Sequence, residues 1–321
     1  MSGRGRAPPS DPLSMAPAYL LRRVAHGVLV LVGASLLVFV LVRVIPGDPA
    51  VLMLGNEATP EALAELRRAL GLDRSLLTQY GLFLSDCLHG NFGVSLRSQR
   101  PVLDMILESL PATLQLTGAA VLVSVLVGVP VGVLSAVRRG RAVDDWSMLL
   151  SLLAQSIPNF WLGLMLISLL AVQLRLLPVS GRGTVWHLVM PTITLSLYTL
   201  GILIRLTRAG MLEVLGHEYI TSARARGVRE SVLVFKHALR NALVPVIAVL
   251  GVQVGTMLGG AVVTEAVFRW PGIGELAVVA LAQRDYPAIQ AIVLLSATAF
   301  VVINFLADLA YRLVDPRIRL E

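Results

Sequence analysis

The chain has 321 residues, of which 56% are hydrophobic and only 15% charged, and it carries a formal net charge of +7 at pH 7. A composition this apolar excludes an ordinary soluble globular protein. The single cysteine, Cys87, excludes an intrachain disulfide framework and a cysteine-based zinc site. The positive charge is not clustered as a nucleic-acid-binding face requires, so we expect no nucleic acid partner and attribute the charge to membrane topology.

Six segments are apolar and long enough to cross a bilayer, which takes roughly 20 residues of α-helix. They span residues 24–45, 112–137, 146–177, 188–208, 242–267 and 288–313. The third segment is too long for one straight span, and Pro158 predicts a kink inside it. The sequence therefore predicts an all-α polytopic membrane protein with six transmembrane helices.

Arginines gather at the two chain ends and in the connections that follow the second and fourth segments. Outside the long fourth connection they are Arg4, Arg6, Arg22, Arg23, Arg138, Arg139, Arg141, Arg312, Arg317 and Arg319. Positively charged connections stay on the cytoplasmic side, and an even number of spans puts both termini there. Residues 1–20 predict a disordered cytoplasmic tail. The first apolar run is too long for a signal peptide and lacks a cleavage site, so we expect an uncleaved anchor.

The polar interval 46–110 lies between the first two spans, on the external side, and is too long to be a bare connection. Thr59 and Pro60 predict the N-cap and first residue of a helix that ends at Gly71. A second helix is expected over 76–88. The first two membrane helices are therefore separated by an external helical insertion.

Five polar side chains inside the third and fifth spans need hydrogen-bond partners or a water-filled cavity. They are Gln155, Ser156, Asn159, Gln253 and Thr256. One interpretation is hydrogen bonding between helices, which is common in membrane bundles. The other is that these side chains line a polar pathway through the membrane.

After the fifth span, the run F-R-W-P-G-I-G begins at Phe268. Trp270 and, further on, Tyr286 suit the bilayer interface, where aromatic side chains collect. Pro271 followed by Gly272 also fits a re-entrant or gating turn. Interfacial anchoring and an external gate formed by Phe268, Trp270, Pro271 and Gly272 are therefore alternatives for this run.

The interval between the fourth and fifth spans is the longest non-apolar stretch in the C-terminal half. Two helical patterns meet in it at Gly227, which can adopt the positive φ of a turn. Residues at spacings of three and four form one face in each pattern: Leu212, Leu215, Tyr219 and Ala223, then Val228, Val232, Phe235 and Leu239. The loop either docks into a groove of another protein or lies on the lipid surface with Arg224, Arg226 and Arg229 against anionic headgroups.

Residues 219–227, Y-I-T-S-A-R-A-R-G, and 236–242, K-H-A-L-R-N-A, resemble the cytoplasmic coupling loop of bacterial binding-protein-dependent ABC importers. More narrowly, they resemble the first permease subunit of the dipeptide/oligopeptide branch. Thr221 stands where the broad family has Glu and Arg240 where it has Pro, and both departures are usual in the peptide branch. In this family the loop docks into a cleft on an ATPase subunit, so the resemblance favours docking over the lipid surface.

Five further motifs resemble the same branch, although glycine and proline in them also serve simply to shape turns. They are I-P-G-D-P at 45–49, L-G-L-D at 70–73, G-N-F-G-V-S at 90–95, F-R-W-P-G-I-G at 268–274 and D-P-R at 315–317. The resemblance covers nearly the whole chain and implies a type I ABC importer permease fold. The implied units are a first helix with the external region (21–111), a core permease domain (112–315) containing the coupling loop (210–241), and a cytoplasmic C-terminal tail (316–321).

The resemblance implies alternating access driven by two separate ATPase subunits, which bind ATP and Mg²⁺, so that this chain itself binds no cofactor. It also implies a second related permease, an extracytoplasmic substrate-binding protein and the lipid of a bacterial inner membrane as partners. The implied ATPase-coupling residues are Glu218, Tyr219, Ala223, Arg224, Ala225 and Gly227. The implied pathway runs between the central spans, where the polar residues named above lie. Dipeptides or oligopeptides are the implied substrates, with glutathione or nickel chelates as the alternative.

Sequence motifs for ATP binding, zinc-dependent proteolysis and serine hydrolysis are absent. The sequence has no G-x-x-x-x-G-K-[S/T] loop, no H-E-x-x-H and no G-x-S-x-G, and its five histidines lack metal-ligand spacing on a shared helix face. We therefore expect neither enzyme activity nor a metal site. An ion-gradient-driven secondary transporter is the remaining alternative. It would need a carboxylate at mid-depth and an internal repeat, whereas Glu265 and Asp308 both lie near span ends.

Overall fold

The computed structural model describes residues 17–44, 51, 59–69, 71 and 73–314. Within these ranges the regular elements are all helices, and an isolated bridge between Val94 and Pro101 is the one β feature. The expected C-terminal tail (316–321) and the motifs at 45–49 and 315–317 lie outside the described residues. Of the tail expected over 1–20, residues 17–20 are described, and they form the first turn of a helix instead.

Five helices of the described chain are long and apolar enough to cross a membrane, or six if one bent pair counts as a single span. The five are α1 (Pro17–Val44), α5 (Val102–Val137), α8 (Val185–Leu215), α11 (Leu239–Phe268) and α13 (Tyr286–Val314). The bent pair consists of α6 (Ala142–Ser156) and α7 (Asn159–Leu166), the latter continued by the π-helix η1 (Ile167–Gln173). These helices correspond to the six predicted segments, the bent pair being the third.

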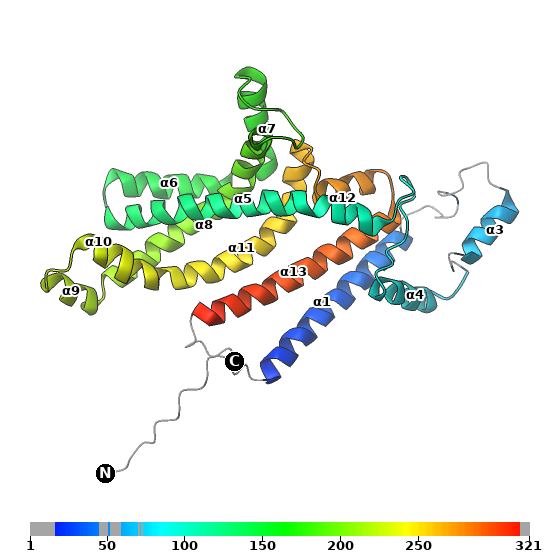
Figure 1. The fold of residues 1–321 in the computed structure, drawn as a ribbon, viewed down its shortest axis with the longest axis horizontal. Coiled ribbons are helices and arrows are strands. Elements are labelled where there is room, and N and C mark those ends of the chain that lie inside the picture. Colours follow the sequence, from blue (N-terminus) through cyan, green and yellow to red (C-terminus); the bar gives the residue numbers. More distant parts are fainter. Residues whose placement is uncertain (1–16, 45–50, 52–58, 70, 72, 315–321) are drawn as a thin grey trace, which may run out of the picture.

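The predicted kink at Pro158 is confirmed, and it is a complete break, because the two halves meet at 102°. Ile157 has φ −83° and ψ 122°, an extended conformation. Proline forces the residue before it out of the helical region and has no N–H to continue the ladder. As a result α7 stands away from the other long helices, at the top of Figure 1.

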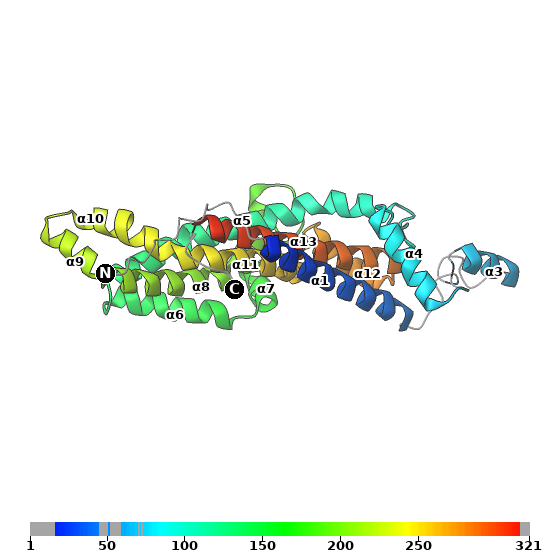
Figure 2. The same cartoon turned by 90° about the horizontal axis from the view of Figure 1, so that it is seen from below.

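The long helices form an elongated bundle that is flat when seen from below (Figures 1 and 2). α1 contacts α13, α13 contacts α11, α11 contacts α8, and α8 also contacts α5 and α6. The shorter helices are α3 (Pro60–Ala69), α4 (Leu76–Leu88), α9 (Glu218–Ala225), α10 (Glu230–Val232), the π-helix η2 (Leu233–Ala238) and α12 (Ile273–Ala282). α9 and α10 lie at one end of the bundle, and α3, α4 and α12 lie toward the other (Figure 1).

The insertion between the first two membrane segments has the helices that the sequence predicts. α4 covers residues 76–88 as expected, and Thr59 caps α3 by accepting a hydrogen bond from the amide of Ala62 at 3.3 Å. α4 is held to α1 by the hydroxyls of Tyr80 and Ser35, which lie 2.9 Å apart. The insertion is therefore connected to the first membrane helix by a side-chain contact as well as by the chain.

α5 is longer than expected, because it begins at Val102 rather than at 112 and carries Pro111 inside it. A proline breaks one hydrogen bond of the helix ladder. The extra turns are stabilised by tertiary packing, since Val102 and Ile106 are buried against α12 and α13. The prediction that the second span starts after Pro111 is therefore wrong.

Small residues of α5 allow it to lie very close to α8. A Cβ atom on Gly132 would be 2.7 Å from the carbonyl oxygen of Ile204 and 2.7 Å from the Cβ of Thr207. Gly128, one turn earlier, faces Leu203 in the same way at 3.0 Å. In a membrane such close backbone approach stabilises helix pairs where apolar burial cannot. Gly128 and Gly132, a G-x-x-x-G pair, therefore mediate a helix contact within this chain, between α5 and α8.

We predict that Gly132→Ala lowers the free energy of unfolding of the purified protein by about 1–3 kcal/mol, and with it the unfolding temperature, because the added methyl group overpacks the α5–α8 contact. Gly118→Ala is the matched control, since it lies on the same helix with no heavy atom within 4 Å of its Cβ. Thermal unfolding of both variants in detergent measures the difference. Equal stability of the two variants would contradict the proposed importance of this contact.

Candidate functional site

The polar loop between α8 and α11 is built from three short helical pieces. α9 ends before Gly227, whose φ of +81° turns the chain toward α10 and η2. The amide of Gly227 donates to the carbonyl oxygen of Arg224 at 3.0 Å, which closes the turn. The predicted join at Gly227 is confirmed. A second break at Gly216 and His217, where His217 is extended (φ −71°, ψ 146°), interrupts the first pattern and was not predicted.

The two apolar faces predicted for this loop are only partly correct. On α9 the structure buries Ile220 together with Ala223 and leaves Tyr219 43% exposed. In the second pattern it leaves Phe235 64% exposed. The residues buried there instead are Leu233, Val234 and Ala238. The reason is that 233–238 is a π-helix, which advances by about one extra residue per hydrogen bond and so rotates the buried face away from the α-helical pattern.

Polar contacts set the shape of the loop. The guanidinium of Arg224 donates to both carboxylate oxygens of Glu230, at 3.0 and 2.8 Å. Both side chains are exposed, so this pair contributes little to stability, but it holds α9 and α10 on either side of the turn. The hydrogen bond to Glu230 raises the pKa of Arg224. At the other end of α9, the amide of the Asn241 side chain donates to the Tyr219 hydroxyl at 2.9 Å, which connects α9 to the first turn of α11.

The predicted coupling residues divide into two groups in the structure. Those exposed on the loop are Glu218, Tyr219, Arg224, Ala225 and Gly227. Ala223 is buried and faces the chain itself. The exposed residues, at the end of the bundle, are accessible to a partner protein. Ala223 is not accessible and instead packs α9 against the rest of the chain.

The five candidate pathway residues are not brought into one hydrogen-bonded group. The side chain of Gln155 on α6 accepts a hydrogen bond from Arg205 of α8 at 2.7 Å. On α11 the hydroxyl of Thr256 donates to the Gln253 side chain at 2.8 Å. Ser156 donates to the carbonyl of Leu152, and Asn159 begins α7. Hydrogen bonding between helices therefore accounts for Gln155, while Gln253 and Thr256 bond within one helix.

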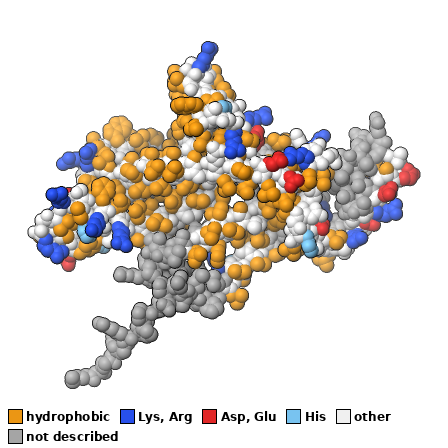
Figure 3. All heavy atoms as spheres, in the orientation of Figure 1, with side chains coloured by type: hydrophobic (Ala, Val, Ile, Leu, Met, Phe, Trp, Pro, Cys, Tyr) orange, Lys and Arg blue, Asp and Glu red, His pale blue; other side chains and the backbone are white. Residues whose placement is uncertain are grey.

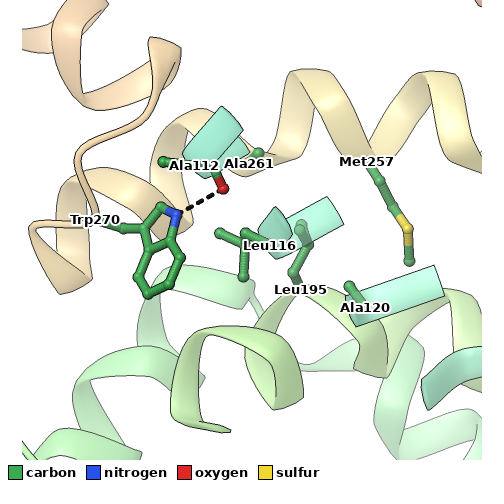
Figure 4. Packing of buried hydrophobic residues seen from close by; sticks show 7 residues of the cluster. All are labelled: Ala112, Leu116, Ala120, Leu195, Met257, Ala261 and Trp270. Carbon is green, nitrogen blue, oxygen red and sulfur yellow. Dashed lines mark hydrogen bonds between the residues drawn. The ribbon is translucent and has the colours of Figure 1, made fainter. Parts of the chain in front are cut away.

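The run after α11 is a tightly held turn. Arg269, at φ +50°, ends α11 in the left-handed region. Trp270 is 1% exposed, and its indole N–H donates to the carbonyl oxygen of Ala112 on α5 at 2.8 Å (Figure 4). Phe268 and Tyr286 are also buried. The alternative of anchoring at the lipid interface is therefore wrong for Trp270 and Tyr286, since both rings lie inside the protein.

Figure 4 shows how Trp270 closes a buried cluster between three membrane helices. The cluster contains Ala112, Leu116, Ala120, Leu195, Met257, Ala261 and Trp270, from α5, α8, α11 and the turn after α11. A neighbouring loop joins in, because the amide of Gly181 donates to the carbonyl oxygen of Phe268 at 2.9 Å. The turn is thus fixed from two sides.

A buried ion pair near the opposite end was missed by the sequence analysis. Asp144 of α6 accepts hydrogen bonds from Arg208 of α8 at 2.5 and 2.8 Å. It also accepts from the Ser135 hydroxyl at 2.6 Å and from the Gly140 amide at 3.0 Å. The donors to this carboxylate come from α5, from the α5–α6 turn and from α8. The Asp144 side chain therefore connects α6 to α5 and α8. No local pattern connects residues 64 positions apart, so the pair becomes visible only in the structure.

Among the described residues, no group of three or more His, Cys, Asp or Glu side chains could hold a metal ion.

Two family models match the chain. Residues 128–320 match the family described as binding-protein-dependent transport system inner membrane component, and residues 17–117 match the corresponding N-terminal membrane component. The first match alone covers more than half of the chain. The chain belongs to this family. It is therefore a multi-pass inner-membrane permease of a binding-protein-dependent ABC importer, a transport component rather than a member of an enzyme class, and it requires ATPase and substrate-binding partners.

Curated relatives of this permease resemble it along almost its whole length. The dipeptide transport system permease protein DppB of Escherichia coli (strain K12) is 40% identical over 333 residues, covering 94% of this chain and 98% of the relative. The di/tripeptide transport system permease protein DppB of Pseudomonas aeruginosa is 40% identical over 331 residues, with the same coverage. The glutathione transport system permease protein GsiC of Escherichia coli (strain K12) is also 40% identical, over 301 residues.

Solved structures support the fold of the permease. A chain of the MetNI methionine ABC transporter in an inward-facing conformation matches with a TM-score of 0.55 and 22% identity, covering 67% of this chain and 98% of that chain. A chain of an amino acid ABC transporter crystallised with histidines matches with a TM-score of 0.51 and 17% identity. The implied fold class, an all-α ABC importer permease, is confirmed.

We predict that Asp144→Ala lowers the stability of the permease by about 3 kcal/mol, because it leaves the Arg208 guanidinium partly buried without its partner. Asp145→Ala is the control, since Asp145 is the next residue and is exposed. Thermal unfolding in detergent compares them. If both variants unfold at the wild-type temperature, the ion pair does not stabilise the α5–α6–α8 contact.

Proposed function

We propose that this chain is the membrane permease subunit of an ATP-binding-cassette importer that moves peptides of the dipeptide/oligopeptide class across the bacterial inner membrane. The observation that carries the proposal is the 40% identity with dipeptide permeases over 94% of the chain. The shape of the α8–α11 loop supports it, since α9 is exposed, short and hinged at a glycine. Transport would proceed by alternating access, powered by separate ATPase subunits.

Both termini and α9 are proposed to face the cytoplasm. α9, α10 and the α5–α6 turn lie at one end of the bundle, and α1 begins and α13 ends on that side (Figure 1). Figure 3 shows lysine and arginine side chains with few acidic ones at the α9–α10 end, a mixture of basic and acidic side chains toward the α3–α4 end, and hydrophobic side chains along the middle. This distribution supports the orientation because positively charged loops stay on the cytoplasmic side.

The coupling step begins at the exposed surface of α9. Two ATPase subunits would bind ATP and Mg²⁺, which this chain does not bind itself. One would contact α9 of this chain and the other the equivalent helix of a second permease. The exposed contacts are Glu218, Tyr219, Arg224, Ala225 and Gly227, with Ala223 behind them. Because Tyr219 is bonded to Asn241 and Ile220 is buried, displacement of α9 acts directly on α8 and α11.

The second permease and the lipid would cover the apolar surface of the described helices. Trp146 on α6 is 63% exposed and Trp161 on α7 is 47% exposed. Large exposed apolar side chains on membrane helices contact either lipid or another helix. Gln155, Ser156, Asn159, Gln253 and Thr256 remain candidates for the pathway between the two permeases. The turn formed by Phe268, Trp270, Pro271 and Gly272 remains the candidate external gate.

Glutathione is the second candidate substrate, because the glutathione permease relative is as similar to this chain as the dipeptide permeases are. The test is uptake of labelled dipeptides and of glutathione by proteoliposomes that contain both permeases and both ATPase subunits, with the binding protein outside. ATP-dependent dipeptide uptake supports the proposal. Glutathione uptake alone selects the second candidate. Uptake that continues without ATP and collapses with an ionophore would replace the proposal with a secondary transporter.

We predict that Gly227→Pro leaves membrane insertion intact and abolishes the ATPase stimulation caused by loaded binding protein. Proline fixes φ near −65° and removes the amide that bonds to Arg224, whereas the turn requires φ of +81°. Stimulated and basal ATP hydrolysis in proteoliposomes measure the effect.

Gly227→Ala and Gly140→Ala form a matched pair for this experiment. Both glycines have positive φ, and neither has a heavy atom within 4 Å of an added Cβ, so the two alanines impose similar backbone strain. We expect reduced stimulation only for Gly227→Ala. Normal stimulation in Gly227→Pro would remove the coupling role from this loop.

A further inference from the structure

The N-terminus of the short external helix α12 is capped entirely by other helices. Its N-cap residue is Gly272, which has no side chain to accept from the first amides. The amide of Ile273 donates to the hydroxyl oxygen of Thr113 on α5 at 2.9 Å. The next two amides, of Gly274 and Glu275, donate to one carboxylate oxygen of Glu265 on α11, at 2.7 and 3.3 Å. Amides that most helices satisfy with their own N-cap residue are here satisfied by α5 and α11.

Glu265 is placed for this role with very little freedom. Its side chain is 0% exposed, and the positive end of the α12 dipole favours a carboxylate at that position. A Cβ atom on Gly272 would lie 2.3 Å from the carboxyl group of Glu265. Gly272 has φ −104° and ψ −177°, an ordinary extended conformation that any residue can adopt. Glycine is therefore required at 272 by the approach of the carboxylate and not by the backbone.

α11 connects this cap to the coupling loop. Its first turn is bonded to α9 through Asn241 and Tyr219, and its last turns carry Glu265. At 1.5 Å per residue, its 30 residues span about 45 Å, which is more than the thickness of the hydrocarbon core. A displacement that begins at α9 can therefore reach the external end along one continuous helix, and Glu265 is where that helix holds α12.

We propose that Glu265 is a positioning residue for transport: its carboxylate holds the N-terminus of α12 on α11, so that α12 follows α11 when the ATPase subunits close. The proposal rests on the proposed function of the chain as an importer permease. Without the carboxylate, α12 keeps its apolar contacts with α5 and α13 and its close packing on α11, where Gly274 lies against Val262, but its first amides lose their acceptor on α11. ATP hydrolysis then continues while α12 follows α11 less faithfully, and substrate passes less often per ATP.

The test uses Glu265→Leu and Glu265→Gln in the complete importer reconstituted with its binding protein. The two side chains are similar in size, but only glutamine retains an oxygen that accepts the α12 amides. We expect Glu265→Leu to lower peptide uptake per ATP hydrolysed about tenfold, because the amides of Gly274 and Glu275 both lose their acceptor. Glu265→Gln should keep most of the wild-type ratio. An equal loss in both variants, or no loss in Glu265→Leu, would overturn the proposal.

Glu275→Leu is the matched control, because Glu275 is a carboxylate on α12 itself whose side chain caps no helix. Its ratio of uptake to hydrolysis should equal that of wild type. If Glu265→Leu does not assemble with its partners, Glu265→Asp takes its place, since it keeps the charge and withdraws the carboxylate from the amides. A wild-type ratio in Glu265→Asp would then overturn the proposal. Failure of the wild-type complex to couple uptake to ATP would refute the proposed function instead.

Gly272→Ala gives an independent check on the same contact. Its methyl group collides with the Glu265 carboxyl group, so the single variant should lower the ratio as Glu265→Leu does. In a Glu265→Ala background the collision with the carboxyl group is removed, and Gly272→Ala should then cause no further loss. Such non-additivity is the signature of two residues that act through one contact. Additive losses would show that Gly272 and Glu265 act separately, against the proposal.

Discussion

The close contact between α5 and α8 is the constraint on which the rest of the structure depends. Lipid tails are as apolar as the side chains of membrane helices, so helices in a bilayer gain little from apolar burial and associate by packing and polar contacts. α5 meets α8 through Gly128 and Gly132, where any side chain would collide with the α8 backbone or with Leu203 and Thr207. Asp144 then joins α6 to the same pair through Arg208. These contacts give the bundle a fixed base beside the loop that joins α8 and α11.

The two ends of the bundle use buried polar groups in the same way. At the end that carries α9, the Asp144 carboxylate receives four hydrogen bonds from α5, the α5–α6 turn and α8. At the other end, Glu265 receives the amides of α12, and the Trp270 indole bonds to α5. Burying a polar side chain is costly unless it is hydrogen-bonded, so each carboxyl group favours the one arrangement of helices that supplies its donors. Between the two ends, apolar and small residues let the helices remain in contact.

Local patterns in the sequence were sufficient for many elements. Pro158 predicted the break between α6 and α7 because the effect of proline on its neighbour depends on two residues only. Thr59 and Pro60 predicted the start of α3, and Gly227 predicted the turn after α9, for the same reason. Hydropathy alone located the membrane segments, since a bilayer requires a minimum apolar length. The motifs of the loop between α8 and α11 were also sufficient to recognise the family, which two family models and the relatives confirmed.

What the sequence could not determine depends on residues that are distant along the chain. The extension of α5 through Pro111 results from packing of Val102 and Ile106 on α12 and α13, and no local signal predicts it. The π-helix η2 rotated the buried face, so that Phe235 became exposed where the α-helical period had placed it inside. Trp270 appeared suited to the lipid interface by its chemistry, but α5 supplied a carbonyl oxygen that holds it inside the protein. Sequence thus determined composition, spans, turns and family, because these follow from short-range chemistry. Only the tertiary structure decided which carboxylates, glycines and aromatic rings meet, because each of those contacts joins separate helices.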